Sequence, residues 1–257
     1  MKTPPNKCLF CLAENRSFTR VEHIIPESLG NDDTLLEAGF VCDICNQYFG
    51  SKIENVVINA PPFGVERVAF DIKTKKGKHP FFDSAPHFQL YPTNVRDQIA
   101  ILGSVDFLDH LSISNRLILP NNREHDTLTA RLLLKIGLEL LVDSDAIDPY
   151  EPRFDLARRY ARAPKSNDRW QMSYGVFPYK DELSITRYDS EGPIHTEQLY
   201  RYEIGMLSSG DIILSFMYRS HLFGCNLLQP DIDQYVKQFS AINAFPLQVI
   251  ETSVIPS

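Results

Sequence analysis

Two pairs of cysteines with Cys-x-x-Cys spacing lie within the first 45 residues of the chain. The first pair is Cys8 and Cys11, and the second is Cys42 and Cys45. Four thiolates at these spacings suit a tetrahedral zinc ion that is closed to solvent and therefore structural. A segment this short is too small to make a good core of its own, so a bound metal would hold it together. The cysteines therefore predict a small module stapled by zinc.

The full chain of 257 residues is long enough for one large domain or for a small module joined to a larger one. The position of the cysteine pairs favours the second arrangement, with a zinc module at residues 1–60 and an α+β domain at residues 61–257. The fifth cysteine, Cys225, stands alone and is interpreted as a buried small apolar side chain rather than a reactive thiol.

Composition limits where such a protein works and what it binds. No run approaches the ~18 apolar residues of a membrane span, and the N-terminus lacks signal-peptide features, so we expect a cytoplasmic protein without membrane contact. In that reducing compartment, Cys-x-x-Cys pairs favour metal over disulfides, and a thioredoxin-like redox role would need only one pair. The net charge of −7 argues against a lysine-coated polyanion binder, but local basic patches can still contact nucleic acid.

The segment around the cysteine pairs predicts the order strand, loop, strand, helix. Residues 19–25 alternate β-branched and polar side chains and stop at Pro26, as a short strand does. A loop rich in glycine, asparagine and aspartate follows, and residues 39–42 predict a second strand. Asp43 is a good N-cap for a helix over residues 44–57.

The motifs in this order resemble the zinc-stapled HNH endonucleases, whose ββα-metal fold has the same sequence of elements. Taken together the motifs are specific, whereas any one alone would be weak. The resemblance covers about residues 5–58 and rests on Cys8-x2-Cys11, Glu22-His23-Ile-Ile-Pro26, Gly30-Asn31 and Cys42-x2-Cys45-Asn46-x3-Gly50-x3-Glu54.

The resemblance implies an enzyme that hydrolyses DNA phosphodiester bonds. It gives His23 the role of general base on water, Glu22 the metal-ligand position usually held by Asp or His, and Asn46 that of the second protein ligand. Because these ligands are oxygens, the implied catalytic cation is Mg²⁺ or Mn²⁺, separate from the structural Zn²⁺. Taken alone, His23 would instead be interpreted as a core or zinc-associated histidine.

Two further residues of the module have two interpretations each. Asn31 is either the middle asparagine of the family, which braces the loop, or an ordinary turn residue. Glu54 either supports the metal ligands or is an exposed helix residue. The alternative for the whole module is a non-catalytic zinc domain that binds nucleic acid or a protein partner.

The larger domain shows weaker chemical signals. A wide apolar stripe predicts a core helix over residues 126–143, and a second helix is expected over residues 154–163. On the second helix, Arg158, Arg159 and Arg162 fall on one face, which is either a phosphate-contact surface or a solvated face paired with acids. The lysine run 73–78 is usually just a solvated turn, but it could touch phosphate.

Alternating apolar and polar residues predict an antiparallel sheet between residues 170 and 228, closed by a helix at residues 232–239. Residues 87–91 and 100–119 are also expected to be strands. The predicted fold class is therefore α+β, with an N-terminal ββα-metal module followed by a larger α+β domain.

The resemblance also implies partners besides DNA. Modules of this kind occur in bacterial and phage-defence proteins, so a role in defence or restriction is implied. A free nuclease would threaten its own chromosome, and we therefore expect restraint by an activating ligand, a protein partner or a homodimer. One centre nicks one strand, so double-strand cleavage would need two centres.

Overall fold

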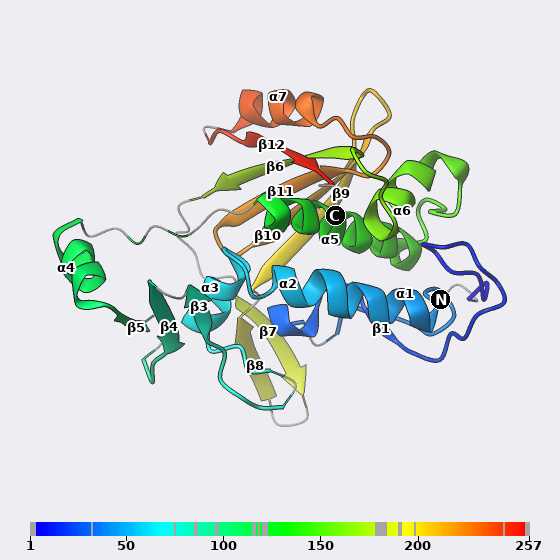
Figure 1. The fold of residues 1–257 in the computed structure, drawn as a ribbon. Helices are drawn as coiled ribbons and strands as arrows, with labels where there is room; N and C mark the ends of the chain where they lie inside the picture. The colour runs from blue at the N-terminus through cyan, green and yellow to red at the C-terminus, as the bar shows by residue number, and fades with distance from the viewer. Residues whose placement is uncertain are drawn as a thin grey trace.

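The computed structural model of the 257-residue chain gives an α+β fold with antiparallel sheets (Figure 1). Residues 184–189 and 192–197 are described by their backbone alone. The described residues are 4–31, 33–74, 76–84, 87–95, 98–114, 117, 119, 123–177, 184–189, 192–197, 199–243 and 245–254.

The N-terminal module has the expected order of strand, loop, strand and helix. Strand β1 (Glu22–His23) pairs antiparallel with β2 (Leu35–Leu36), and the 3₁₀ helix η1 (Glu27–Leu29) lies in the loop between them. A continuous helix follows, built of α1 (Asp43–Tyr48), the π-helical η2 (Phe49–Glu54) and α2 (Asn55–Val57).

Three details of the module differ from the prediction. The first strand spans only Glu22–His23 and not residues 19–25. The second strand lies at β2 rather than at residues 39–42, because the backbone there serves the cysteine cluster: Phe40 O accepts from Leu9 N, and Cys42 N donates to Cys8 Sγ. The N-cap of the helix is Cys42 and not Asp43. The Asp43 carboxylate instead accepts hydrogen bonds from Thr19, which ties the helix start to the chain before β1.

A small layer follows the module. The helix α3 (Phe63–Ala69) packs on a three-stranded antiparallel sheet, and α4 (Val105–Ser114) extends from the last strand at one end of the molecule. The predicted strand at 87–91 is confirmed. The one predicted at 100–119 is confirmed over residues 100–103 and is wrong over residues 105–114, which form α4, while residues 115, 116 and 118 lie outside the described residues. The sheet contains β3 (Phe82–Ser84), β4 (Phe88–Pro92) and β5 (Ile99–Gly103).

The C-terminal part is a five-stranded antiparallel sheet with helices on both faces. The antiparallel sheet predicted between residues 170 and 228 is confirmed in the described residues, except that β7 and β8 form a sheet of their own, and β12 is an addition that the sequence pattern did not indicate. The sheet order is β12 (Gln248–Ser253), β6 (Arg169–Val176), β11 (His221–Asn226), β10 (Ile212–Tyr218) and β9 (Tyr200–Met206), with a separate hairpin of β7 (Ser184–Asp189) and β8 (Gly192–Glu197).

The predicted helices of this part are also present. They are α5 (Arg123–Ser144), α6 (Asp155–Arg162), which follows the 3₁₀ turn η3 (Pro152–Phe154), and α7 (Asp233–Ile242). Cys225 lies fully buried in β11, as expected for a small apolar side chain.

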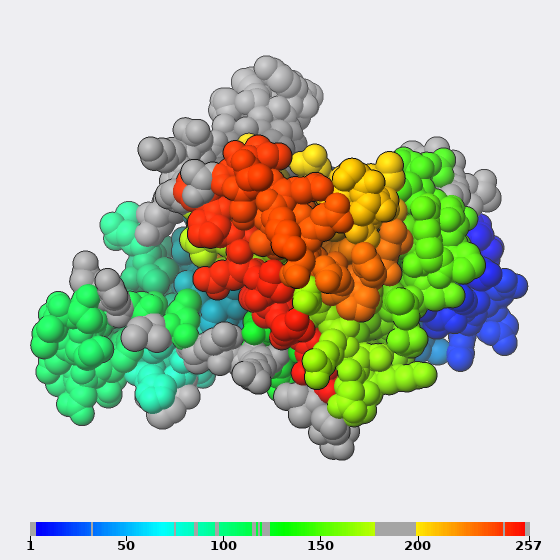
Figure 2. All heavy atoms as spheres, turned by 90° about the horizontal axis from the view of Figure 1, so that it is seen from above, coloured from blue at the N-terminus to red at the C-terminus, as the bar shows by residue number. Residues whose placement is uncertain are grey.

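The long helix α5 lies between the five-stranded sheet and the helix of the N-terminal module, while α7 covers the other face of the sheet (Figure 1). Viewed from above, the N-terminal residues and α4 lie at opposite ends of the molecule (Figure 2). One apolar core runs through the junction, with Phe49 of the module and Leu134 of α5 both fully buried in it. The module is therefore packed against the rest of the chain and is not connected to it by a linker alone.

None of the helices in the part of the chain that the structure describes has the length and apolar character of a membrane span.

Candidate functional site

The four cysteines of the two pairs form one cluster. Their sulfur atoms all lie within 4.8 Å of one another. The Sγ atoms of Cys11 and Cys42 are 3.8 Å apart. A zinc ion with Zn–S bonds of ~2.3 Å would separate its sulfur ligands by ~3.8 Å in a regular tetrahedron. The donor set and its spacing therefore fit a structural zinc ion.

The surroundings affect the cysteines of this cluster differently, and burial raises the pKa of Cys42 to about 11. A hydrogen bond from the Cys45 thiol lowers the pKa of Cys8 to about 4. Arg162, at the end of α6, donates from Nε to Cys45 Sγ over 3.4 Å. Its guanidinium carbon also lies 3.7 Å from the centroid of the Tyr48 ring. The C-terminal part of the chain thus places a positively charged guanidinium group against the cysteine cluster of the N-terminal module.

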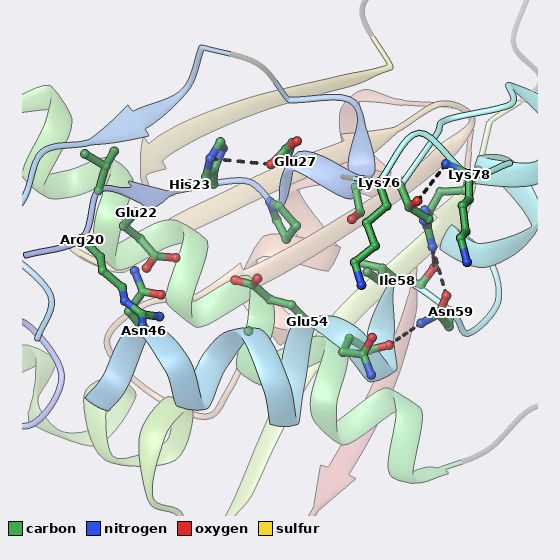
Figure 3. Close-up of a pocket in the computed structure, with 17 residues that line it drawn as sticks. Arg20, Glu22, His23, Glu27, Asn46, Glu54, Ile58, Asn59, Lys76 and Lys78 are labelled. Atoms are coloured by element: carbon green, nitrogen blue, oxygen red, sulfur yellow. Dashed lines mark hydrogen bonds and ion pairs between the residues drawn. The ribbon is translucent and has the colours of Figure 1, made fainter. Parts of the chain in front are cut away.

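A cavity of about 820 Å³ lies between β1, the helix of the module and the loop that follows α3. Glu22, His23 and Asn46, the three residues predicted for catalysis, all line it (Figure 3). Lys76 and Lys78 line the same cavity from the loop side. The structure therefore brings the three predicted residues together around one space.

Strand geometry sets the directions of Glu22 and His23. Neighbouring side chains of a strand point to opposite sides, and β1 contains only these two residues. In Figure 3 Glu22 points toward Asn46 on the module helix, whereas His23 points toward Glu27 in η1. The His23 Nε2 and Glu27 Oε2 atoms are 3.9 Å apart. The strand ends at His23, three residues before Pro26, and both side chains line the cavity.

The π-helical segment η2 brings a fourth residue to the site. An α-helix turns about 100° per residue, so two residues eight positions apart would differ by about 80° around the axis. The wider π turns between Asn46 and Glu54 advance fewer degrees per residue, which brings the two side chains toward one face. Figure 3 shows both rising from the helix into the cavity. Glu54 is therefore a cavity residue and not an exposed helix residue.

Asn31 is fully buried and braces the loop between the two strands. Its Nδ2 donates to Ile25 O over 2.7 Å and to Thr34 O over 3.1 Å. Its Oδ1 accepts from Thr34 N over 2.9 Å. These bonds close the loop that holds η1 beside β1, which agrees with the bracing role rather than with an ordinary turn residue.

A residue that the sequence analysis missed lies under the site. Lys135 of α5 is fully buried, and its Nζ lies 2.7 Å from Glu22 Oε1 and 3.0 Å from Glu54 Oε1. It also lies 3.2 Å from Glu139 Oε2, one turn further along α5. The sequence does contain a signal for this buried ion pair: a lysine and a glutamate lie four residues apart within an apolar run, where a wide stripe of the helix is buried. The run is Leu-Leu-Leu-Lys-Ile-Gly-Leu-Glu-Leu-Leu.

The charge balance of this cluster suits a hard cation. Three carboxylates, of Glu22, Glu54 and Glu139, surround one ammonium group. Burial raises the pKa of Glu139 well above its usual range, against the lowering effect of Lys135. Even with Glu139 neutral, two carboxylates face one ammonium, and a cation bound by oxygen atoms of Glu22 and Asn46 would offset the remaining charge. These residues therefore fit Mg²⁺ or Mn²⁺.

The expected arginine face on α6 is divided by the packing. Arg158 is buried and donates to the carbonyl oxygens of Pro149 and Glu151 and to the carboxylate of Asp155, so it is not part of an exposed surface. Arg162 turns to the cysteine cluster. Arg159 is exposed and lies 3.5 Å from a carboxylate oxygen of Asp168. The structure does not bring the three arginines together, because α6 buries one side against α5.

The lysine loop is the basic group that faces the cavity. The side chains of Lys76 and Lys78 are exposed at its rim, together with that of Arg20 before β1. Arg67 also lines the cavity but is buried, and its guanidinium donates to Ile58 O and Asn59 Oδ1. The sequence allowed two interpretations of this lysine run, a solvated turn or a phosphate contact, because nothing along the chain shows that the loop folds back onto β1.

One comparison with known proteins gives a match, to the N-terminal part of the chain. A protein-family model described as HNH endonuclease matches residues 8–61. Neither the curated proteins nor the solved structures provide a match to the chain. The matched residues contain both cysteine pairs, β1 and the whole module helix. The part of the chain that forms the cysteine cluster and one side of the cavity thus matches the HNH endonuclease family, and it continues into a longer α+β region that the match does not cover.

Proposed function

We propose that this protein is a metal-dependent endonuclease that hydrolyses DNA phosphodiester bonds. One observation carries the proposal: Glu22, His23 and Asn46 line a single cavity within the segment that matches the HNH endonuclease family. The strand supplies an acid and a histidine, and the helix supplies an amide oxygen. This set contains a general base and the ligands of a hard cation, which are the groups that hydrolysis of a phosphodiester requires.

His23 is the general base in this proposal. Its imidazole takes a proton from a water molecule, whose oxygen then forms a bond to the phosphorus while the bond from phosphorus to the leaving oxygen breaks. The leaving oxygen takes up a proton from solvent. Glu27, 3.9 Å from His23 Nε2, favours the protonated imidazole that forms in this step.

Glu22 and Asn46 would hold the catalytic cation, with Glu54 close to Asn46 on the same face of the module helix. The cation supplies positive charge that stabilises the negative charge developing on the phosphate and the leaving oxygen. Mg²⁺ keeps several water ligands in protein sites, so two protein oxygens are sufficient to hold it.

The DNA backbone is expected to follow the rim of the cavity past Arg20, Lys76 and Lys78. These three cations are exposed around the same space as His23. A local basic rim also explains how a chain with a net charge of −7 can bind a polyanion. Arg159 stays a predicted phosphate contact at a separate position.

The test is cleavage of supercoiled plasmid by the purified full chain. We expect nicking with Mg²⁺ or Mn²⁺ and none with EDTA, and His23→Ala should lose nicking while keeping its zinc content. A parallel reaction on RNA of the same sequence distinguishes the two nucleic acids. DNA binding without metal-dependent nicking would favour the alternative, a non-catalytic zinc module that binds nucleic acid or a protein partner.

The biological setting is a separate part of the proposal. A role in prokaryotic defence or restriction rests on the resemblance of the module, and the cytoplasmic location rests on composition. Control by an activating ligand, a protein partner or a homodimer follows from the danger of an unrestrained nuclease. Sedimentation of the protein with and without DNA tests the homodimer, and a monomer that makes concerted double-strand breaks would contradict it.

A further inference from the structure

Lys135 connects the helix α5 to the candidate active site. Its side chain is fully buried, and its Nζ lies 2.7 Å from Glu22 Oε1. The same nitrogen donates to the backbone carbonyl oxygens of His23 and Ile24, over 2.7 and 3.3 Å. One ammonium group therefore contacts the acid predicted to bind metal and the backbone of the histidine predicted to act as base.

These contacts restrain both β1 and the helix of the module. An ammonium group has three N–H donors, and here the two shortest contacts are to the consecutive residues Glu22 and His23. The contact with Glu54 at 3.0 Å joins the helix of the module to the same nitrogen. Lys135 thus ties β1 to the helix that carries Asn46.

Packing of α5 does not account for an ammonium group at this position. The neighbouring side chains Leu134 and Ile136 are fully buried and apolar, and an apolar residue in place of Lys135 would fit the same stripe. Removing an ammonium group and three carboxylates from water is costly, and buried ion pairs are weak evidence for stability. The contacts with the site offer a specific role for this charge.

We propose that Lys135 is a positioning residue of the nuclease site, which holds the Glu22 carboxylate and the His23 backbone in the arrangement that binds the catalytic cation. The inference rests on the proposed function, because it needs Glu22 to be a metal ligand. It assigns a role in the site to a residue outside the segment matched to the HNH family. The active site is therefore complete only when α5 is in place.

The site depends on α5 because this helix lies between the C-terminal sheet and the N-terminal module. The helix packs against strands β6, β10, β11 and β12 on one side and against η2 and α2 of the module on the other. A movement of α5 on the sheet would move the Lys135 ammonium relative to Glu22. The arrangement of the Glu22 carboxylate therefore depends on how α5 is seated on the sheet.

The obvious variant, Lys135→Met, leaves Glu139 buried without its ammonium partner and is at risk of unfolding. The double variant Lys135→Met/Glu139→Met removes both members of the pair on α5 and restores an apolar stripe. Glu139→Met alone is the matched control, since it changes the same helix and the same cluster but keeps the contact between Lys135 and Glu22. Thermal denaturation and zinc content establish that each variant folds.

Two measurements then test the inference: Mn²⁺ binding followed by calorimetry, and single-turnover plasmid nicking over a range of Mn²⁺ concentrations. In the folded double variant we expect Mn²⁺ affinity to fall by about 10- to 100-fold, the range found when groups that orient metal ligands are removed. Nicking at saturating Mn²⁺ should also fall, because the His23 backbone loses its support. Glu139→Met should stay much closer to the original protein in both measurements.

Unchanged Mn²⁺ affinity and unchanged nicking in the folded double variant would overturn the inference while leaving the proposed nuclease function intact. Tighter Mn²⁺ binding with equal or faster nicking would also overturn it, and would identify Lys135 as a charge that competes with the cation. An original protein that binds no Mn²⁺ and cuts nothing would remove the proposed function and this inference together.

Discussion

The hydroxyl group of Tyr200 donates a hydrogen bond to Oδ1 of Asn31 over 2.8 Å. Tyr200 is the first residue of β9 in the C-terminal sheet, whereas Asn31 braces the loop between β1 and β2 of the N-terminal module. Both side chains are buried. The loop that carries η1 beside His23 is therefore held from inside the module and from the C-terminal sheet at once.

Asn31→Ala should destabilise the protein strongly. The substitution removes the donor to the Ile25 carbonyl oxygen and the acceptor for the Thr34 N–H, while the Thr34 carbonyl oxygen keeps only its bond from Ile24 N. Buried groups left without hydrogen bonds cost ~1–3 kcal/mol each, and we expect the free energy of unfolding to fall by ~2–4 kcal/mol in total. Tyr200→Phe removes a single hydroxyl group from the same network and should cost ~1 kcal/mol. Urea denaturation of the zinc-loaded protein measures both, and equal losses in the two variants would contradict the bracing role.

His23→Ala should lower the rate of nicking at saturating Mn²⁺ by ~100- to 10,000-fold, which is the usual contribution of a general base. DNA affinity should change little, because the basic residues of the rim remain. His110→Ala is the matched control, since His110 is exposed on α4 at the far end of the molecule. Nicking by His23→Ala at the rate of the His110→Ala control would remove His23 from the mechanism.

Removal of zinc should unfold the module and not only inactivate it. The cysteine cluster ties the chain before β1 to the start of the module helix, and a module of this size draws much of its stability from the metal. Cys42→Ser should purify with less than one zinc ion per chain and a lower melting temperature. Cys225→Ala changes a buried cysteine outside the cluster and should keep its zinc. Elemental analysis and circular dichroism compare the two variants, and full zinc occupancy in Cys42→Ser would exclude this ligand set.

Arg162 should slow the loss of zinc. Its Nε donates to Cys45 Sγ, and its guanidinium covers the Tyr48 ring. Substitution by alanine should raise the rate of zinc transfer to a chelator by about 10-fold or more, since groups that bond to metal ligands contribute on this scale. Arg159→Ala removes an exposed arginine of the same helix and should leave the rate unchanged. Equal rates in both variants would show that Arg162 packs beside the cluster without stabilising it.

Local sequence signals were sufficient for much of the module and for the element types of the larger domain. The spacing of the cysteines predicted a cluster that the folded chain forms, and the apolar stripe of residues 126–143 predicted α5. These features depend on short spacings and on helical or strand periodicity, which a single sequence displays directly. The match of residues 8–61 to the HNH family agrees with the resemblance drawn from the motifs.

Other features depend on contacts between distant parts of the chain. Lys135 meets Glu22 across more than one hundred residues, and nothing local distinguishes it from a lysine at the edge of an apolar stripe. Arg158 was expected at the surface because helical spacing shows which residues share a face but not which face is buried. The π-helical segment that directs Glu54 into the cavity has no clear residue signature either.

Lys76 and Lys78 should carry part of the DNA affinity. Each phosphate contact contributes ~0.9 to the slope of log affinity against log salt concentration on duplex DNA. Both lysines lie at the rim of the cavity that contains His23. The double variant Lys76→Ala/Lys78→Ala should therefore bind duplex DNA more weakly and show a slope smaller by ~2.

Lys165→Ala/Lys237→Ala removes the same amount of charge from exposed positions that do not line the cavity, and it controls for the change in net charge. Binding is measured by fluorescence anisotropy in EDTA, so that cleavage does not interfere. We expect the control to keep a slope close to that of the original protein. If both double variants lose the same slope, the DNA responds to overall charge and the rim of the cavity is not its path.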